Sequence, residues 1–432
     1  MKRPHDLRRR RLLGAAAAGL LGSVAGCALG PSGAGSGAAR VVVVGGGYGG
    51  ATAAKYLRLY SGGRLDVVLV EPDAAFISCP LSNLVLGGSK TMADITLPYA
   101  SLERNHGVRL VRDRVDRIDA DQRVAVLGSG ERLRYDKLVL SPGVEMMWDS
   151  VGGLRAANEQ NRIVQAWKAG PETTTLRRQL EAMGDGGVFA IVIPETPYRC
   201  PPGPYERACQ VAHYFKAAKP RSKVLVLDAN EDVTSKGALF KRVWADSYAG
   251  TIEYRPQHRA AAVDAAAGVV KFEVQDEVRA DVLNVLPAMR AGAVAVQAGL
   301  ANANGRWCLV NFLNFESTAV RHVHVLGDSI QVAPAMPKSG HMANGHAKVA
   351  AAAIVAELDG GEIDPAPMLT NTCYSFVDDQ RAIHVASVHE YVGAERTFKT
   401  VAGSGGLSGA ANEPEGRYGW NWARTIWADA LA

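Results

Sequence analysis

The chain has 432 residues, 47% of them hydrophobic and 21% charged, a composition typical of a globular protein with two or three domains. Its formal net charge of +5 comes from residues 1–27, where six basic residues face one acid, Asp6. The rest of the chain is close to neutral, which argues against a protein that binds nucleic acid.

The N-terminal segment is predicted to be an export signal. Four consecutive arginines precede an apolar run, residues 12–26, that is too short and too rich in alanine and glycine to span a membrane. This order favours the twin-arginine route, which carries folded proteins, and predicts a periplasmic location. Val24-Ala25-Gly26-Cys27 also resembles a lipoprotein cleavage box, so Cys27 is a candidate for lipidation. An uncleaved anchor is the alternative, and residues 31–39 read as a flexible linker.

A dinucleotide-binding unit follows. Residues 41–44 form an apolar strand, a glycine-rich turn with Gly45, Gly47 and Gly50 comes next, and a helix over residues 51–59 leads to a second strand ending on Glu71. The glycines allow a tight turn at which a helix N-terminus approaches a pyrophosphate, and Glu71 can accept hydrogen bonds from a ribose. Flavin-dependent disulfide reductases continue with two nearby cysteines, whereas this chain has the single Cys79.

The remainder of this unit contains three short alternating segments, residues 108–112, 114–118 and 123–127, which predict a small antiparallel meander. Residues 135–143 then resemble the strand that returns the chain to the flavin site in flavoproteins with two dinucleotide domains. That resemblance makes Gly143 a cofactor-binding candidate.

A second α/β unit runs from about residue 172 to residue 286, with strands at residues 188–193 and 223–227 and Asp228 in the place of a ribose-binding acid. Its first turn, residues 194–204, holds prolines and the carboxylate of Glu195 where NADH-using relatives have glycines. Proline lacks an amide donor, and a carboxylate repels phosphate. The sequence therefore predicts a Rossmann-like domain without a usable NADH site.

The chain is then predicted to return to the first domain. An apolar strand ends in Gly327-Asp328, the place of the aspartate that bonds the ribityl chain of FAD in this flavoprotein class. Met336-Pro337-Lys338-Ser339-Gly340 precedes a helix of about twenty residues, whose N-terminus would stabilise negative charge on a flavin ring. Residues from 362 onward form a small last unit that ends in an aromatic segment with Trp420, Trp422 and Trp427.

Four motifs together resemble the flavoprotein subunit of flavocytochrome c sulfide dehydrogenase, from about residue 40 to the C-terminus. They are Cys79-Pro80-Leu81-Ser82-Asn83, the stretch Arg199-Cys200-Pro201-Pro202-Gly203-Pro204-Tyr205-Glu206-Arg207, Pro337-Lys338-Ser339-Gly340, and Asn371-Thr372-Cys373-Tyr374-Ser375. The resemblance implies an α/β fold with two Rossmann-like domains of the flavin disulfide reductase type and a small C-terminal α+β domain. The expected division is 1–39 (signal and linker), 40–155 and 291–361 (FAD-binding domain), 156–290 (second Rossmann-like domain) and 362–432 (C-terminal domain).

The resemblance also assigns roles to the cysteines. It implies a thioether from Cys79 to FAD, where the alternative is a buried structural cysteine. It places Cys200 and Cys373 over the flavin as a redox-active disulfide, which hydrosulfide can open. A structural disulfide between domains, or pairing of Cys200 with Cys209, are the other possibilities; Cys209 and Cys308 are interpreted as buried thiols.

Three further expectations concern acids, metals and partners. The resemblance implies a base at Glu206, although an acid in a first helical turn also simply suits the helix dipole. By resemblance, Lys338 is counted with the cofactor-binding residues. His341 and His346 are five residues apart, which does not align two ligands on one helical face, so no metal site is expected.

The sequence lacks a C-x-x-C-H haem motif, so the electron acceptor must be another protein or a quinone. The leading hypothesis is an exported sulfide:cytochrome c oxidoreductase that forms sulfane or elemental sulfur and pairs with a c-type cytochrome subunit in a heterodimer. A sulfide:quinone reductase, with the tryptophan-rich tail as a membrane-binding surface, and a non-catalytic accessory flavoprotein of a sulfur-oxidation system are the alternatives.

Overall fold

The computed structural model describes residues 37–432. The predicted export signal and the candidate lipidation site Cys27 lie outside these residues. Among residues 37–432, no helix combines the length and the apolarity needed to span a bilayer.

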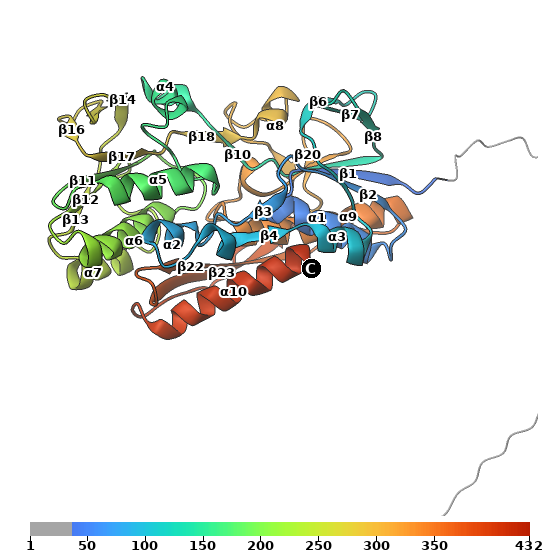
Figure 1. Cartoon of the computed structure of the whole chain (residues 1–432). Coiled ribbons are helices and arrows are strands. Elements are labelled where there is room, and N and C mark those ends of the chain that lie inside the picture. The colour runs from blue at the N-terminus through green and yellow to red at the C-terminus, as the bar shows by residue number, and fades with distance from the viewer. Residues whose placement is uncertain (1–36) are drawn as a thin grey trace, which may run out of the picture. The chain divides into compact units, whose positions relative to one another are not determined.

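The first sheet has seven strands in the order β19-β20-β21-β9-β1-β2-β5. Its central strands, among them β1 and β2, are parallel (Figure 1). β21 pairs with β9 although 185 positions separate the paired residues Leu138 and Val323. The chain therefore returns to the first sheet after the second α/β unit. The strands are β1 (Arg40–Val44), β2 (Asp66–Val70), β5 (Arg109–Val111), β9 (Lys137–Leu140), β19 (Val310–Asn311), β20 (Glu316–Ser317) and β21 (Val323–Val325).

Two helices, α1 (Tyr48–Tyr60) and α9 (Gly340–Asp359), pack against each other beside this sheet. α9 has twenty residues and closes on Gly360, whose left-handed φ of 71° suits a glycine at a helix C-terminus. Shorter elements complete this part: β3 (Ala75–Ile77), α2 (Ser82–Gly87), β4 (Thr96–Pro98), α3 (Ala100–His106), β10 (Val144–Met146), α4 (Leu154–Glu159), β18 (Met289–Ala291) and α8 (Ala293–Gln297).

The antiparallel meander exists, but one of its predicted strands is wrong. Its strands are β6 (Val115–Asp119), β7 (Val124–Leu127) and β8 (Arg132–Arg134). Residues 109–111 instead form β5, which pairs in parallel with β2 at the edge of the large sheet. Helix α3 supplies the crossover that a parallel neighbour needs, and alternation alone cannot distinguish the two partners.

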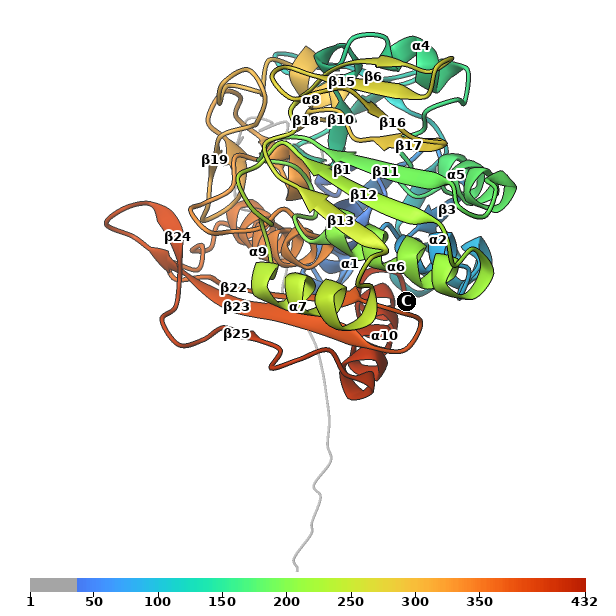
Figure 2. The same cartoon turned by 90° about the vertical axis from the view of Figure 1, so that its left-hand side faces the viewer.

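The second sheet is parallel, in the order β13-β12-β11-β17, and helices α6 and α7 lie between it and the C-terminal strands (Figure 2). Its elements are α5 (Pro171–Ala182), β11 (Val188–Ile193), α6 (Gly203–Ala218), β12 (Lys223–Asp228), α7 (Gly237–Ser247), β13 (Ile252–Arg255) and β17 (Val282–Val285). A small antiparallel sheet accompanies it, formed by β14 (Ala260–Asp264), β15 (Val269–Phe272) and β16 (Val278–Arg279).

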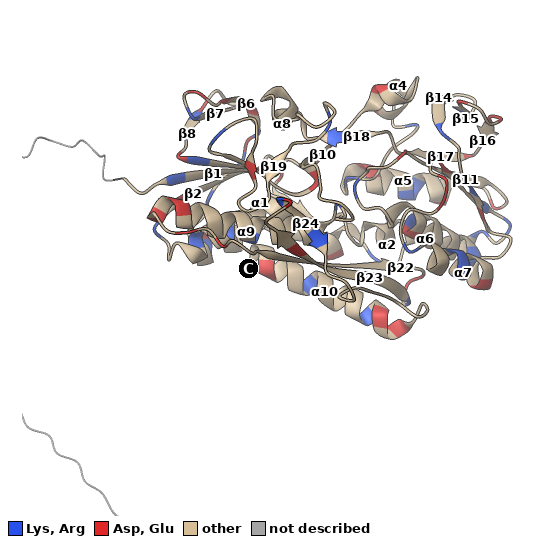
Figure 3. Cartoon of the chain, turned by 180° about the vertical axis from the view of Figure 1, so that it is seen from behind, with Lys and Arg blue, Asp and Glu red and all other residues tan. Residues whose placement is uncertain are grey.

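The C-terminal part is an antiparallel sheet covered by one long helix, which confirms the predicted α+β unit. Its elements are β22 (Met368–Phe376), β23 (Ala382–Val392), β24 (Thr397–Thr400), β25 (Gly406–Leu407) and α10 (Glu413–Leu431). α10 packs on β22, β23 and α1. In the view of Figure 3, basic and acidic residues are interspersed along the elements, as the near-neutral composition predicts.

Candidate active site

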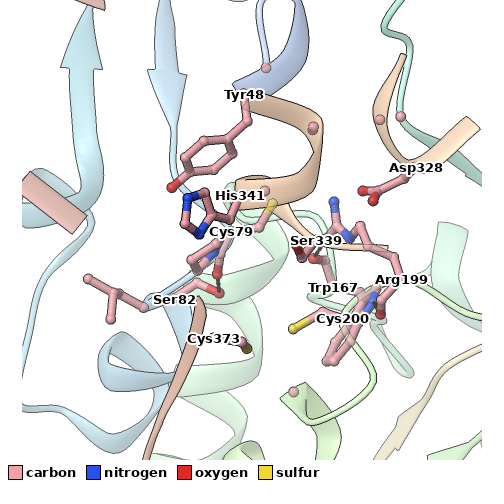
Figure 4. A pocket seen from close by; sticks show the side chains of 18 of the residues that line it. Tyr48, Cys79, Ser82, Trp167, Arg199, Cys200, Asp328, Ser339, His341 and Cys373 are labelled. Atoms are coloured by element: carbon pink, nitrogen blue, oxygen red, sulfur yellow. Dashed lines mark hydrogen bonds between the residues drawn. The ribbon is translucent and has the colours of Figure 1, made fainter. Parts of the chain in front are cut away.

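One cavity collects side chains from both Rossmann-like parts and from the C-terminal sheet (Figure 4). The predicted residues that line it come from six separate segments: the β1–α1 turn, the loop after β3, the loop after β9, the β11–α6 loop with the first turn of α6, the turn after β21, and strand β22. They are Gly47, Cys79, Gly143, Cys200, Glu206, Asp328 and Cys373.

The β1–α1 turn forms a cradle in which Gly45 and Gly50 have no room for a side chain. Gly45 has a φ of 93°, and a Cβ there would lie 2.5 Å from the carbonyl oxygen of Ser141. A Cβ on Gly50 would lie 1.7 Å from the carbonyl oxygen of Gly45. A Cβ on Gly47, by contrast, would meet nothing within 4 Å, because this residue faces the cavity at the N-terminus of α1. The turn therefore fits a pyrophosphate approaching the helix N-terminus.

Glu71 stands beside this turn, directly after β2. Its carboxylate accepts hydrogen bonds from the amide of Gly46 at 2.5 Å and from the amide of Asp73 at 2.9 Å. Burial raises the pKa of Glu71, and the two amide donors partly oppose that shift. The carboxylate is thus held next to the glycine turn, in the place expected of a ribose-binding acid.

Asp328 points a carboxylate into the cavity. Its Oδ1 is buried and has no hydrogen-bond partner among the described residues. Burial raises the pKa of Asp328, while Arg199 and Lys338 favour its charged form. A buried oxygen without a partner costs free energy, so a hydroxyl donor from a bound ligand fits this position well.

Lys338 does not reach the cavity. Its ammonium donates to the carbonyl oxygens of Asp328 at 2.9 Å and Ile330 at 2.5 Å, and it lies 3.7 Å from the ring centroid of Trp307. Burial lowers its pKa to about 7. Lys338 therefore holds the backbone of the turn that carries Asp328, and the structure gives it no direct contact with the cavity.

The half-buried thiol of Cys79 lies among donors and cations. Its Sγ accepts a hydrogen bond from the amide of Ala169 at 3.4 Å. Two cations, Arg199 and Lys168, lie near this thiol. Burial lowers the pKa of Lys168, whereas the pKa of Arg199 is raised because neighbouring acidic groups outweigh burial. Cys79 therefore lines the cavity beside two cationic side chains.

Cys200 and Cys373 line the same cavity, but as free thiols. Cys200 adopts a left-handed φ of 58°, a strained conformation for a residue with a side chain. Gly203 makes room for it, since a Cβ there would lie 2.9 Å from the Cys200 sulfur. Burial raises the pKa of both thiols. The structure thus brings the two predicted partners together without joining them.

Within residues 37–432, the two other cysteines are buried thiols, as expected. Cys209 lies inside α6, where its Sγ accepts a hydrogen bond from the indole of Trp244 at 3.3 Å. Cys308 is fully buried. Neither lines the cavity, and Cys209 is not bonded to Cys200.

Glu206 connects three parts of the site. It is buried in the first turn of α6, where its carboxylate accepts from the amide of Phe376 at 2.8 Å and the side-chain amide of Asn83 at 3.0 Å. Burial raises its pKa, and its charge acts on both Cys200 and Cys373. A buried carboxylate with a raised pKa beside two thiols is suited to proton transfer.

Two arginines of the site received no role from the sequence, although both belong to the motif around Cys200. Arg207 is 1% exposed and donates to Asn83 Oδ1 at 3.0 Å and to Asn284 Oδ1 at 2.7 Å, which fixes the Cys79 motif against the second sheet. Arg199 lines the cavity, and its carbonyl oxygen accepts from the indole of Trp167 at 3.1 Å. Because their partners come from distant segments, spacing within the motif could not reveal these contacts.

His341 lines the cavity and is held by the strand that carries Cys373. Its Nδ1 accepts a hydrogen bond from the amide of Thr372 at 2.9 Å, which places the ring proton on Nε2. Burial also lowers the pKa of His341. His346 is turned away, and its Nδ1 accepts from the amide of Gly327 at 3.3 Å.

Asp228, the acid at the end of β12, is bonded to other side chains of the second Rossmann-like domain. Asp228 is fully buried and accepts hydrogen bonds from the hydroxyls of Tyr205 at 2.7 Å and Tyr254 at 3.1 Å. Both tyrosine hydroxyls thus donate to the carboxylate that was expected in the place of a ribose-binding acid. The absence of a usable NADH site remains a prediction from the prolines and Glu195 of the β11–α6 loop.

The tryptophan-rich tail is the packed helix α10. Trp427 is buried, and its indole donates to the hydroxyl of Tyr48 at 2.9 Å. Trp422 lines the cavity, and Trp420 is half-buried. The tail therefore closes the site from the C-terminal side.

Three family models match the chain. Residues 173–287 match the central part of the sulfide dehydrogenase (flavocytochrome c) flavoprotein chain, residues 365–431 the flavin-binding part of flavocytochrome c sulphide dehydrogenase, and residues 39–172 the pyridine nucleotide-disulphide oxidoreductases. The flavoprotein chain of sulfide dehydrogenase from Chlorobaculum thiosulfatiphilum is 59% identical over 49 residues, which are 11% of this chain and 100% of that sequence.

Sulfide:quinone oxidoreductases are also similar. The mitochondrial enzyme of Dictyostelium discoideum is 24% identical over 296 residues, covering 66% of this chain but only 62% of that relative. The crystal structure of the enzyme from Aquifex aeolicus aligns with a TM-score of 0.74 at 18% identity, over 91% of this chain and 92% of that one. At this identity the alignment shows a shared fold.

Proposed function

Because this chain belongs to the family of the flavoprotein chain of flavocytochrome c sulfide dehydrogenase, we propose that it is an FAD-dependent sulfide dehydrogenase. The proposed product is sulfane or elemental sulfur, and the proposed acceptor is a c-type cytochrome subunit. One observation carries the proposal: Cys79, Cys200, Cys373 and Glu206, which lie on separate segments, converge on one cavity.

The residues around the cavity fit FAD. The β1–α1 cradle would hold the pyrophosphate, Glu71 the adenosine ribose and Asp328 the ribityl chain, and Cys79 would form the covalent thioether. When bound, FAD supplies the capacity to accept two electrons together and to release them singly. The N-terminus of α9, where Ser339 Oγ accepts from the amide of Met342 at 3.1 Å, contributes a positive helix end at the cavity.

Cys200 and Cys373 carry the proposed sulfur chemistry. In their oxidised form, a disulfide, hydrosulfide attacks one sulfur, so that one cysteine becomes a persulfide and the other a thiolate. Glu206 is the proposed proton acceptor, because burial raises the pKa of its carboxyl group and its charge acts on both thiols.

Anaerobic titration with sulfide tests the proposed reaction. We expect sulfide to bleach the flavin absorbance of the purified protein and added cytochrome c to restore it, while Cys200→Ser and Cys373→Ser abolish bleaching without loss of flavin. Cys308→Ser, which removes a buried thiol outside the cavity, is the matched control. An unchanged spectrum in the wild type would refute the proposal and favour an accessory flavoprotein without turnover.

Covalent attachment is tested separately, on a denaturing gel viewed under ultraviolet light. The wild type is expected to show flavin fluorescence that Cys79→Ser loses. A wild-type band without fluorescence would refute the thioether.

A second candidate, a sulfide:quinone reductase, is favoured by the similarity to such enzymes over two thirds of the chain. The packed position of α10 speaks against its use as a membrane surface. Comparing the rates of sulfide-dependent reduction of cytochrome c and of a water-soluble ubiquinone analogue distinguishes the two acceptors. Export through the twin-arginine route is proposed from the leader alone and is tested by fractionation of cells that express the full chain.

A further inference from the structure

Lys236 is a buried lysine that reaches from the second Rossmann-like domain to the strand that carries Cys373. It precedes α7 in a left-handed conformation with a φ of 57°, and it is 6% exposed. Its ammonium donates to the carbonyl oxygen of Cys373 at 3.0 Å and to Ser375 Oγ at 2.7 Å. Two of its three donors are thus bonded to the strand segment that lines the cavity.

The charges around the two thiols are unequal. For Cys373, burial raises the pKa, and the leading charge is Lys236, which opposes that rise, followed by Glu206, which adds to it. For Cys200, burial also raises the pKa, but the leading charges are Cys373 and Glu206, and both add to the rise before Arg199 and Lys236 oppose it. The surroundings therefore favour a thiolate on Cys373 over one on Cys200.

We propose that Lys236 is a positioning residue that makes Cys373 the thiolate-forming member of the pair, so that sulfide adds to Cys200. This inference rests on the proposed function. Hydrosulfide attacks the Cys200 sulfur, the bond between the two cysteine sulfurs breaks, and a new sulfur–sulfur bond forms on Cys200. The electron pair of the broken bond stays on the Cys373 sulfur as a thiolate, and the proton of hydrosulfide remains on the persulfide until a base accepts it.

The first test needs no sulfide. The reduced protein is alkylated with iodoacetamide across pH 6–10, and mass spectrometry follows Cys200 and Cys373 separately. In the wild type, half-maximal alkylation of Cys373 is expected at a lower pH than that of Cys200. Lys236→Met should slow alkylation of Cys373 near neutral pH by about tenfold or more, the change that corresponds to one pKa unit. Lys236→Arg, which keeps the charge, should restore most of the rate.

Lys241→Met is the matched control, because Lys241 lies on the same helix, is about half exposed and pairs with Asp232 at the surface. It should leave both pH profiles unchanged. An unchanged profile for Cys373 in Lys236→Met, or a lower half-maximal pH for Cys200 than for Cys373 in the wild type, would overturn the proposal. The wild-type comparison decides even if Lys236→Met fails to fold.

The second test follows the sulfur. The oxidised protein receives one equivalent of sulfide and is alkylated at once, and the persulfide is located by mass spectrometry. A persulfide on Cys200 is expected; a persulfide on Cys373 overturns the proposed direction. If neither cysteine acquires sulfur, the proposed function fails, whereas the alkylation profiles still decide what Lys236 does to Cys373.

Discussion

Replacing Gly50 by alanine tests the cradle of the β1–α1 turn at its tightest contact. The new Cβ would lie 1.7 Å from the carbonyl oxygen of Gly45, and real contacts of this kind begin at about 3.0 Å. Gly45 cannot move away freely, because its amide donates to the carbonyl oxygen of Val70 at 2.9 Å and the backbone of Ser141 packs against its other side. The turn is therefore pinned on both sides of the clash.

The expected cost follows from that geometry. Overpacking of a rigid site costs about 1–3 kcal/mol, and the clash here is with backbone, so we expect the upper end of that range. Alanine has a better helix propensity than glycine, which offsets at most about 1 kcal/mol of this cost. Gly50→Ala should therefore lower the free energy of unfolding by about 2 kcal/mol even in flavin-free protein.

Gly47→Ala is the matched comparison, because a Cβ at this position meets nothing within 4 Å and projects into the cavity. We expect the unfolding free energy of the flavin-free protein to change by less than about 0.5 kcal/mol. Flavin binding should weaken instead, since the Cβ occupies space next to the amides at the start of α1.

The assay uses both variants in a Cys79→Ser background, from which the cofactor can be removed. Urea unfolding of the flavin-free proteins measures stability, and fluorescence titration with FAD measures binding. Equal losses of stability in the two variants, or a Gly50→Ala protein as stable as its parent, would refute the claim that Gly50 is required by the packing of the turn and Gly47 by the cofactor.

Three further outcomes are expected. In the Cys79→Ser background, Asp328→Ala should weaken FAD binding by about tenfold to hundredfold, the range for a hydrogen bond to a charged group. The stability of the flavin-free protein should not fall, because Asp328 Oδ1 has no protein partner to lose. A loss of stability as large as the loss of binding free energy would contradict this expectation. Burial raises the pKa of Glu206, so the free energy of unfolding of the wild type should fall as the pH rises from the ordinary pKa of glutamate through the raised pKa. Glu206→Gln should remove this pH dependence, as measured by urea unfolding at several pH values. Trp427→Ala should lower the free energy of unfolding by about 3–5 kcal/mol, because it leaves a cavity at a buried position. Tyr418→Ala on the same helix, where the side chain is 58% exposed, should change that free energy by less than about 0.5 kcal/mol. Similar effects of the two substitutions would mean that α10 is not packed as described.

Local pattern was sufficient for much of the architecture. The glycine turn between two apolar strands, the acid after the second strand and the strand ending in Gly327-Asp328 are short-range signals, because strand, turn and helix propensities act within a few residues. Residues 109–111 show the limit of such signals. A short alternating segment suits either an antiparallel meander or a parallel edge, and only its partner β2 decided between them.

The chemistry of the site depends on which distant side chains meet. The sequence by itself determined the fold class and marked Cys79, Cys200, Cys373 and Glu206 through motifs with a family resemblance. Only the tertiary structure decided that Lys338 donates to the backbone of the turn that carries Asp328. It also decided that two tyrosines donate to Asp228 and that Lys236 donates to the backbone of Cys373. These contacts join segments that no spacing rule relates, because they arise only when the packing of three units brings their surfaces together.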